Sequence, residues 1–356
     1  MSTSTFDRPR VRPHPSSVFG RVILPRLHLE SGDVLEDAPV AYATWGRLNP
    51  SGDNALIVCH ALTGSADAKA WWEALIGPGK ALDTNRFFVV CLNTLGSPYG
   101  SASPVTIDQA SGVRYGPNFP PVTVRDSVMA HRAVLAQIGV RRAVAAVGGS
   151  MGGMQVLEWG FLDGFVQALV PIAVGGRHSA WCIGWSEAQR SAIRADRRWN
   201  GGHYDPNDPP VEGLAAARMM AMVSYRSSSE FSQRFGRERS SRHAFQVEGY
   251  LRYQGEKLVR RFDANCYVAL TNQMDSHDVG RHRGGYEQAL GSLDQPTLVV
   301  GISSDVLYPV GEQEELAELM PNARLAILDA PYGHDSFLVE QAAVGDTVRS
   351  FLDTLA

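Results

Sequence analysis

The run Gly148-Gly149-Ser150-Met151-Gly152 holds the serine best placed for nucleophilic chemistry. It follows an apolar, β-branched segment and precedes the helical pattern MQVLEW, so the serine lies at a strand-to-helix turn. Glycines permit a sharp turn that a Cβ would obstruct. The hydroxyl then projects at the helix N-terminus, where backbone N–H groups favour developing negative charge. We predict that Ser150 is a catalytic nucleophile; the alternative is a packing turn.

A serine nucleophile at such a turn takes its acid and its histidine from later in the chain, in that order. Of the histidines after Ser150, His334 alone comes just beyond a candidate last strand. Asp305 follows the preceding strand, whereas the rival Asp329 is too close to His334 in sequence. We predict that His334 takes the proton from Ser150, and that Asp305 fixes the imidazole tautomer and stabilises the imidazolium.

An acyl-transfer site also needs donors for the oxyanion of the tetrahedral intermediate. One N–H should come from the residue after the serine, Met151, and the second from a loop after an earlier strand. The run His60-Ala61-Leu62-Thr63-Gly64 ends such a strand, and we assign the second donor to the Leu62 N–H. Both donors are backbone groups, so the chemistry does not fix their side chains.

The elements that must position these residues alternate between strands and helices. Short β-branched runs predict strands buried on both faces, and the segments between them show helical periodicity. This alternation predicts a mostly parallel, doubly wound sheet, the α/β-hydrolase fold. Residues 177–291 depart from it, with helical periodicity and no convincing central strand. The prediction is a core of residues 1–176 and 292–356 with a helical lid, 177–291, inserted between its halves. The expected strands are 55–60, 87–92, 144–147, 297–301 and 325–328, and the clearest core helices are 122–138 and 154–161.

Composition limits the classes of protein that the chain can belong to. Its 356 residues are 44% hydrophobic and 20% charged, with a formal net charge of −4, which gives no reason to expect a nucleic-acid partner. The four cysteines form no CxxC pair and are too few for a disulfide framework; those inside apolar strand-like runs should be buried, inert thiols. The first 17 residues lack a signal-peptide core, and no stretch approaches the roughly 18 apolar residues of a membrane span. We expect a cytoplasmic protein with no membrane segment.

Longer blocks of sequence resemble one family over almost the whole chain. These blocks are CHALTGSA, WWEALIGPGKALDT, CLNTLGSPYGSASP, VGGSMGGMQVLEW, RHSAWCIGWSEAQR, YLRYQGEKLVRRFDANCY and YGHDSFL. They are similar to the homoserine O-acetyltransferases, α/β-hydrolase-fold enzymes of methionine biosynthesis. The resemblance implies a ping-pong reaction, in which Ser150 takes an acetyl group from acetyl-CoA and passes it to the hydroxyl of L-homoserine.

The resemblance also implies an acceptor site and an assembly. Arg218 would grip the carboxylate of the amino acid and Asp335 would pair with its ammonium group. Taken without the family, Arg218 could be a surface residue of an amphipathic helix, and Asp335 a helix N-terminal residue. A homodimer through the lid is implied. No metal and no bound cofactor is needed, because the coenzyme A ester is a substrate.

Alternative acceptors and donors stay open at this point. Relatives with nearly the same core acylate serine or use succinyl-CoA, and the block GSPYGSASP differs from the GGCxGTTGP form common in many bacterial homoserine enzymes, resembling a fungal-type branch. One methylene of acceptor length is worth only about 1–3 kcal/mol of discrimination. A serine esterase is a further alternative, because a hydrolase would share the acyl-serine intermediate.

Overall fold

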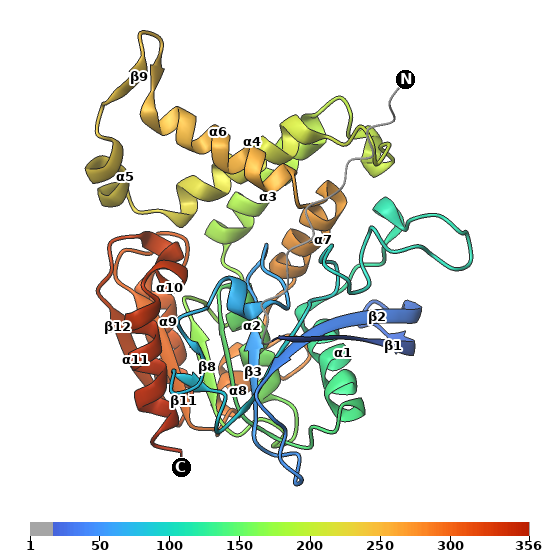
Figure 1. The fold of residues 1–356 in the computed structure, drawn as a ribbon, viewed down its shortest axis with the longest axis vertical. Coiled ribbons are helices and arrows are strands. Elements are labelled where there is room, and N and C mark those ends of the chain that lie inside the picture. Colours follow the sequence, from blue (N-terminus) through green and yellow to red (C-terminus); the bar gives the residue numbers. More distant parts are fainter. Residues whose placement is uncertain (1–16, 356) are drawn as a thin grey trace.

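The computed structural model describes residues 17–355, and an eight-stranded sheet forms its centre (Figure 1). The strand order is β1-β2-β6-β3-β7-β8-β11-β12. β1 and β2 form an antiparallel hairpin that pairs antiparallel with β6, and every other neighbouring pair is parallel. The predicted mostly parallel, doubly wound sheet is confirmed. The strands are β1 (Val18–His28), β2 (Val34–Trp45), β3 (Ala55–Cys59), β6 (Phe88–Leu92), β7 (Ala143–Gly149), β8 (Leu169–Ile172), β11 (Thr297–Ile302) and β12 (Ala323–Leu328).

Helices cover both faces of this sheet. Alternate residues of β3 point to opposite sides: Ile57 belongs to the core cluster that holds α1 and α2, and Leu56 and Val58 belong to the cluster that holds α11. The helices are α1 (Val124–Gln137), α2 (Met151–Gly160), α3 (Ala180–Ala195), α4 (Val211–Tyr225), α5 (Ser228–Phe235), α6 (Gln246–Val259), α7 (Ala264–Asp275), α8 (Tyr286–Gly291), α9 (Val310–Leu319), α10 (Ser336–Val339) and α11 (Gln341–Leu352). Two short pairs, β4 (Ile76–Gly77) with β5 (Leu82–Asp83) and β9 (Arg239–Ser241) with β10 (Ala244–Phe245), lie outside the main sheet.

All five predicted strands are present, but the sheet has members that the sequence did not indicate. β12 is an edge strand, so the prediction that it is buried on both faces was wrong: Leu325 and Ile327 are 38% and 42% exposed. β8 is only four residues long and contains Pro171, which weakens a strand pattern. The β1–β2 hairpin escaped notice because β1 is an exposed edge that also contains a proline.

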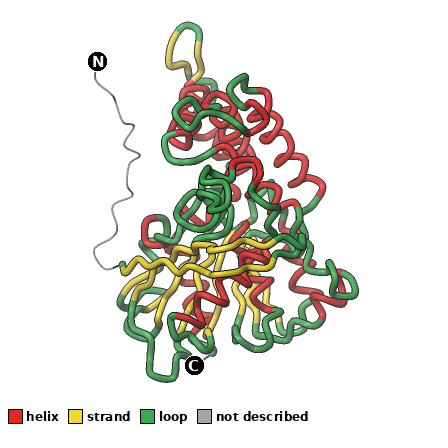
Figure 2. Tube along the Cα trace, turned by 90° about the vertical axis from the view of Figure 1, so that its right-hand side faces the viewer, coloured by secondary structure: helices red, strands yellow, loops and turns green. Residues whose placement is uncertain are grey.

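The chain between β8 and β11 contributes a helical layer, α3–α6, which lies above the sheet (Figures 1 and 2). α4 packs against both α3 and α6. α8 also falls in the range predicted for the lid, yet it packs beside α9 with Ala289 and Leu290 buried in the main core. Helical periodicity shows that a segment has an apolar face, but not which layer that face covers. The first 16 residues of the predicted core, and most of the segment compared with a signal peptide, lie outside the described residues.

All four cysteines are buried as free thiols, as predicted for those in the strands. Burial raises the pKa of the Cys59 thiol to about 12, which keeps it in its unreactive form.

Within residues 17–355 no helix is long and apolar enough to cross a membrane, and no group of three or more His, Cys, Asp or Glu side chains is arranged to hold a metal ion.

A buried carboxylate on α2 ties distant segments together. Glu158 is 3% exposed, and its Oε2 accepts hydrogen bonds from Arg283 Nη2 at 2.6 Å and from Arg125 Nε at 3.2 Å. Glu158→Ala should lower the free energy of unfolding by about 3 kcal/mol, because it removes a shared partner of two guanidinium groups. Urea unfolding measures the loss. Glu256→Ala, which breaks an exposed pair with Arg260, is the control and should cost less than about 1 kcal/mol. Equal losses in the two variants would contradict this account.

Candidate active site

Ser150 lies in the turn between β7 and α2, with a backbone conformation (φ 57°, ψ −127°) that L-residues rarely adopt. The glycines around it are required by the close approach of β3. A Cβ at Gly148 would come within 2.7 Å of the Cys59 carbonyl oxygen, and one at Gly152 within 2.2 Å of the same atom. Both positions therefore exclude any larger residue, as the sequence analysis assumed.

His334 and Asp305 meet at the carboxyl edge of the sheet. The imidazole Nδ1 lies 2.6 Å from Asp305 Oδ2, and Oδ1 of the same carboxylate accepts the backbone N–H groups of Leu307 and Tyr308 at 2.8 and 3.0 Å. With its proton on Nδ1, facing Asp305, His334 presents Nε2 as the basic nitrogen. The rival carboxylate, Asp329, is exposed and accepts a hydrogen bond from Ser303 instead.

The surroundings of His334 tune its basicity. Burial lowers the pKa of the imidazole, but the attraction and the hydrogen bond of Asp305, with a further contribution from Asp335, outweigh burial and raise the pKa above its ordinary value. A base with a raised pKa holds a proton more firmly once it has accepted one. This suits a residue that takes a proton from a hydroxyl and later returns it to a leaving group.

One small cavity brings the predicted site residues together. Its volume is about 50 Å3, and Ser150, His334, Leu62, Arg218 and Asp335 all line it. Asp305 lies behind His334, and Met151 directly follows the serine. The remaining lining residues are Ala61, Thr63, Tyr225, Phe337 and Leu338.

Two backbone N–H groups beside Ser150 are free to bind an oxyanion. Met151 is the first residue of α2, and such positions have no acceptor within the helix. Leu62 lies in the turn that follows β3, whose strand neighbour β7 carries the serine. Within residues 17–355 neither N–H donates to a protein acceptor.

Asp335 already has a cationic partner that the sequence analysis missed. Its Oδ2 lies 3.1 Å from Nε of Arg226, a pair in which both side chains are largely buried. Burial raises the pKa of Asp335, and Arg226, Arg218 and His334 each oppose that rise. Arg218 lies over the ring of Tyr225, 5.5 Å from its centroid. Arg226 directly follows α4 and has an extended backbone, so helical spacing from Arg218 gave no signal for its contact with Asp335.

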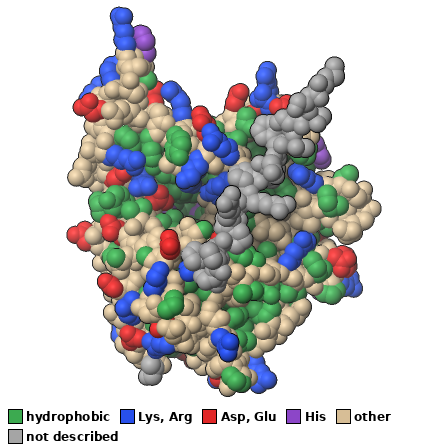
Figure 3. Space-filling view, in the orientation of Figure 1, with side chains coloured by type: hydrophobic (Ala, Val, Ile, Leu, Met, Phe, Trp, Pro, Cys, Tyr) green, Lys and Arg blue, Asp and Glu red, His purple; other side chains and the backbone are tan. Residues whose placement is uncertain are grey.

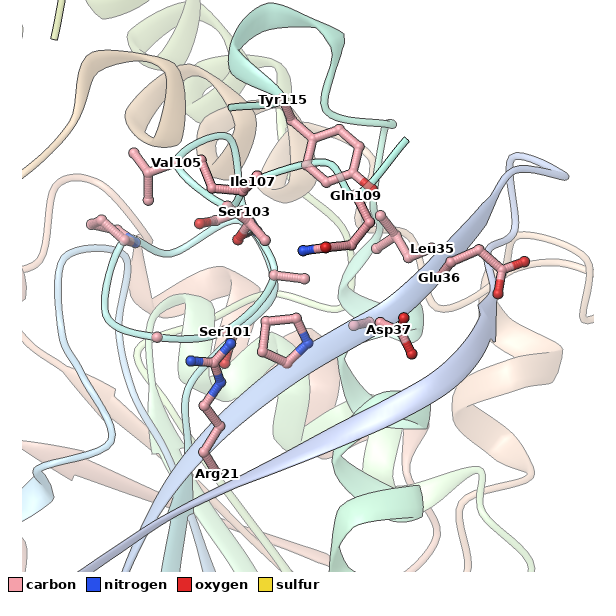
Figure 4. A pocket seen from close by; sticks show the side chains of 16 residues that line it. Arg21, Leu35, Glu36, Asp37, Ser101, Ser103, Val105, Ile107, Gln109 and Tyr115 are labelled. Atoms are coloured by element: carbon pink, nitrogen blue, oxygen red, sulfur yellow. Dashed lines mark hydrogen bonds between the residues drawn. The ribbon is translucent and has the colours of Figure 1, made fainter. Parts of the chain in front are cut away.

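A second hollow, of about 360 Å3, lies between the β1–β2 hairpin and residues 98–115 (Figure 4). Arg21 and Asp37 stand at its rim, with Gln109 and Tyr115 on the opposite wall. Ser101 and Ser103 line it, but none of its described lining residues is a histidine or a cysteine. Its serines therefore have no histidine in this lining to activate them, and the smaller cavity is the candidate reaction site.

Comparison with known proteins agrees with this geometry. A family model described as the alpha/beta hydrolase fold matches residues 54–341, and the chain belongs to that class. A Salinibacter ruber protein named homoserine O-acetyltransferase is 59% identical, over 92% of this chain and 96% of its own length. A Chlorobium chlorochromatii protein of the same name is 54% identical over 92% of each chain. Within the α/β-hydrolase class, the chain belongs to the homoserine O-acetyltransferase family.

The structure is also similar to a crystal structure of esterase E22. The TM-score is 0.88 at 27% sequence identity, over 94% of this chain and 100% of that one. The same architecture therefore occurs in a protein named for ester hydrolysis, so the choice between transferase and hydrolase has to come from the lining of the cavity.

The Asp305–His334 pair predicts a pH dependence. Because Asp305 raises the pKa of His334, the acidic limb of kcat/KM should lie above the ordinary histidine value of about 6.5. Asp305→Asn leaves burial as the dominant influence, which lowers the pKa and moves this limb to lower pH. The rate constant kcat should fall by about 10^4-fold, since the imidazole loses its tautomer control. Asp329→Asn is the matched control, and an equal loss there would reassign the acid.

Proposed function

We propose that the protein is an L-homoserine O-acetyltransferase that works through an acetyl-Ser150 intermediate in methionine biosynthesis. Ser150 Oγ attacks the carbonyl of acetyl-CoA while His334 Nε2 takes its proton, and the thiolate of coenzyme A leaves with that proton. The hydroxyl of homoserine then gives its proton to His334 and attacks the acetyl ester. O-acetylhomoserine is released and the proton returns to Ser150.

The observation that carries this proposal is the placement of Arg218 and Asp335 in the cavity that holds Ser150 and His334. An amino acid presents a carboxylate and an ammonium group, and these two side chains offer the opposite charges. Arg226 would share Asp335 with the ammonium group and limit the cost of burying that carboxylate. A simple ester substrate has no use for such a pair, so the lining favours a transferase over an esterase.

The chain length of the acceptor is supported by the relatives. Proteins 51–59% identical over most of this chain carry the name homoserine O-acetyltransferase. We therefore place homoserine ahead of serine, and acetyl-CoA ahead of succinyl-CoA. Lys and Arg side chains lie beside the hollow between the helical layer and the sheet (Figure 3), where they suit the phosphate groups of coenzyme A.

The assembly and compartment complete the proposal. We propose a homodimer formed through the lid, because large apolar side chains are exposed on its helices: Trp181 is 54%, Val223 45% and Tyr253 57% exposed. Free thiols at all four cysteines suit the cytoplasm. The chemistry requires no metal or bound cofactor.

A grid of acceptors and donors tests the substrate assignment. With acetyl-CoA, homoserine should give O-acetylhomoserine at least about tenfold faster than serine gives its ester, the ratio that one methylene provides. Without an amino acid, coenzyme A release should stop after one equivalent per site. Mass spectrometry of the products and thiol titration measure both. A preference for serine, or continuous release of coenzyme A into water, would overturn the assignment.

The nucleophile is tested by intact mass. Wild-type protein mixed with acetyl-CoA should gain one acetyl group, and Ser150→Ala should gain none, because the substitution removes the proposed nucleophile. Thermal unfolding checks that the variant is folded. Persistence of the adduct in a folded Ser150→Ala protein would contradict the mechanism.

If Arg218 binds the acceptor, its substitution should impair acetyl transfer to homoserine and leave acylation of the enzyme unaffected. Arg218→Met should raise KM for homoserine by about tenfold or more, through loss of a charge-assisted hydrogen bond worth about 1.5–3 kcal/mol. The rate of acetyl-enzyme formation from acetyl-CoA should change little, because the carboxylate is bound only in the second step. Stopped-flow acylation and steady-state transfer measure the two quantities. Slower acylation with an unchanged KM would place Arg218 on the donor instead.

A further inference from the structure

The loop that carries the Leu62 donor is a tight turn held by hydrogen bonds. The Gly64 N–H donates to the Ala61 carbonyl oxygen at 2.8 Å, which closes the turn around Leu62 and Thr63. The Ala61 oxygen also lies 2.9 Å from Nδ1 of His60, which is fully buried. His60 Nε2 accepts the Thr94 N–H at 3.0 Å, so the proton of this imidazole is on Nδ1 and is donated to Ala61.

The Ala61 carbonyl and the Leu62 N–H belong to one peptide group. A peptide group is planar, and in its trans form the C=O and N–H point in opposite directions. Donors that fix the Ala61 oxygen therefore fix the direction of the N–H of Leu62, a residue that lines the cavity. They also polarise it, because a hydrogen bond accepted at the oxygen strengthens the donor at the nitrogen.

The next peptide group repeats this arrangement. The Thr63 carbonyl and the Gly64 N–H share a plane, and the Thr63 oxygen accepts a hydrogen bond from Arg261 Nη1 at 2.8 Å. The same nitrogen lies 2.5 Å from the Tyr99 hydroxyl, and Nη2 lies 3.4 Å from Thr63 Oγ1. A continuous line of donors thus runs from the guanidinium through two peptide groups to the Leu62 N–H.

Arg261 is held firmly enough to act in this way. It lies two residues beyond the end of α6, and its neighbour Phe262 is buried against the ring of Tyr99, with 5.8 Å between centroids. The next residue, Asp263, caps α7 by accepting the Cys266 N–H at 3.1 Å. The backbone on the far side of Arg261 is therefore anchored in the core, while its guanidinium reaches the turn.

We propose that Arg261 is a positioning residue of the oxyanion hole, which aligns and polarises the Leu62 N–H through the peptide groups 63–64 and 61–62. This inference rests on the acyl-serine chemistry proposed for Ser150. It links the end of the helical layer to the reacting carbonyl without any contact between Arg261 and the substrate.

The test is the rate of acylation by p-nitrophenyl acetate, which requires neither coenzyme A nor an amino acid. Arg261→Met should slow acylation roughly tenfold, less than the about 10^2-fold cost of removing an oxyanion donor outright. Arg261→Lys, which keeps a cationic donor, should recover part of the rate. Arg260→Met is the matched control, because that neighbour lies on the surface beside Glu256 and should leave the rate unchanged.

A spectroscopic measurement separates alignment of the oxyanion hole from a general structural effect. In the acetyl-enzyme made with a 13C-labelled carbonyl, hydrogen bonds from the oxyanion hole lower the carbonyl stretching frequency. Arg261→Met should raise this frequency, Arg261→Lys should give an intermediate value, and Arg260→Met should match the wild type. An unchanged frequency, with or without slower acylation, overturns the proposal. If the wild type forms no acetyl-enzyme at all, the proposed function fails instead.

Discussion

The close approach of β3 to the turn after β7 is the constraint on which the site depends. The Cys59 carbonyl, the last of β3, leaves no room for a Cβ at Gly148 or Gly152, so the two strand ends meet almost in contact. β3 then continues directly into the turn that carries the Leu62 N–H, and β7 continues into Ser150 and α2. The predicted nucleophile and the predicted oxyanion donors are adjacent because their strands are neighbours, at the carboxyl edge where parallel sheets place their ligands.

Two carboxylates, those of Asp305 and Asp335, determine the electrostatics at the carboxyl edge of the sheet. Asp305 acts on His334 from behind and gives the base its tautomer and its raised pKa. Asp335, the residue after His334, lines the same cavity and pairs with Arg226, which follows α4. In the proposed mechanism the two carboxylates serve different steps, although each raises the pKa of the His334 imidazole.

Much of this arrangement was predictable from local signals. Ser150 stands in a five-residue motif, and Asp305 and His334 follow from chain order and from their places after strands. Arg226 and Arg261 were not found, because their roles depend on where the end of one helix meets a loop distant in sequence. β8 was missed and α8 was misplaced for a related reason: a four-residue strand and a six-residue helix have too few residues for periodicity to identify their partners. The candidate catalytic residues, which stand in local motifs, were therefore easier to predict than the residues that contact them from distant parts of the sequence.

The sheet order has a consequence for how the protein folds during its synthesis. β11 must pair with β8 across the whole inserted segment, and only then can the loops after β11 and β12 deliver Asp305 and His334. A chain still being synthesised can form the serine turn and its helix long before it has a base. The predicted acid and base thus join the serine turn only after β11 and β12 have been made, and until then the chain carries an inert hydroxyl. Acyl transfer therefore has to wait for the segment that follows β12.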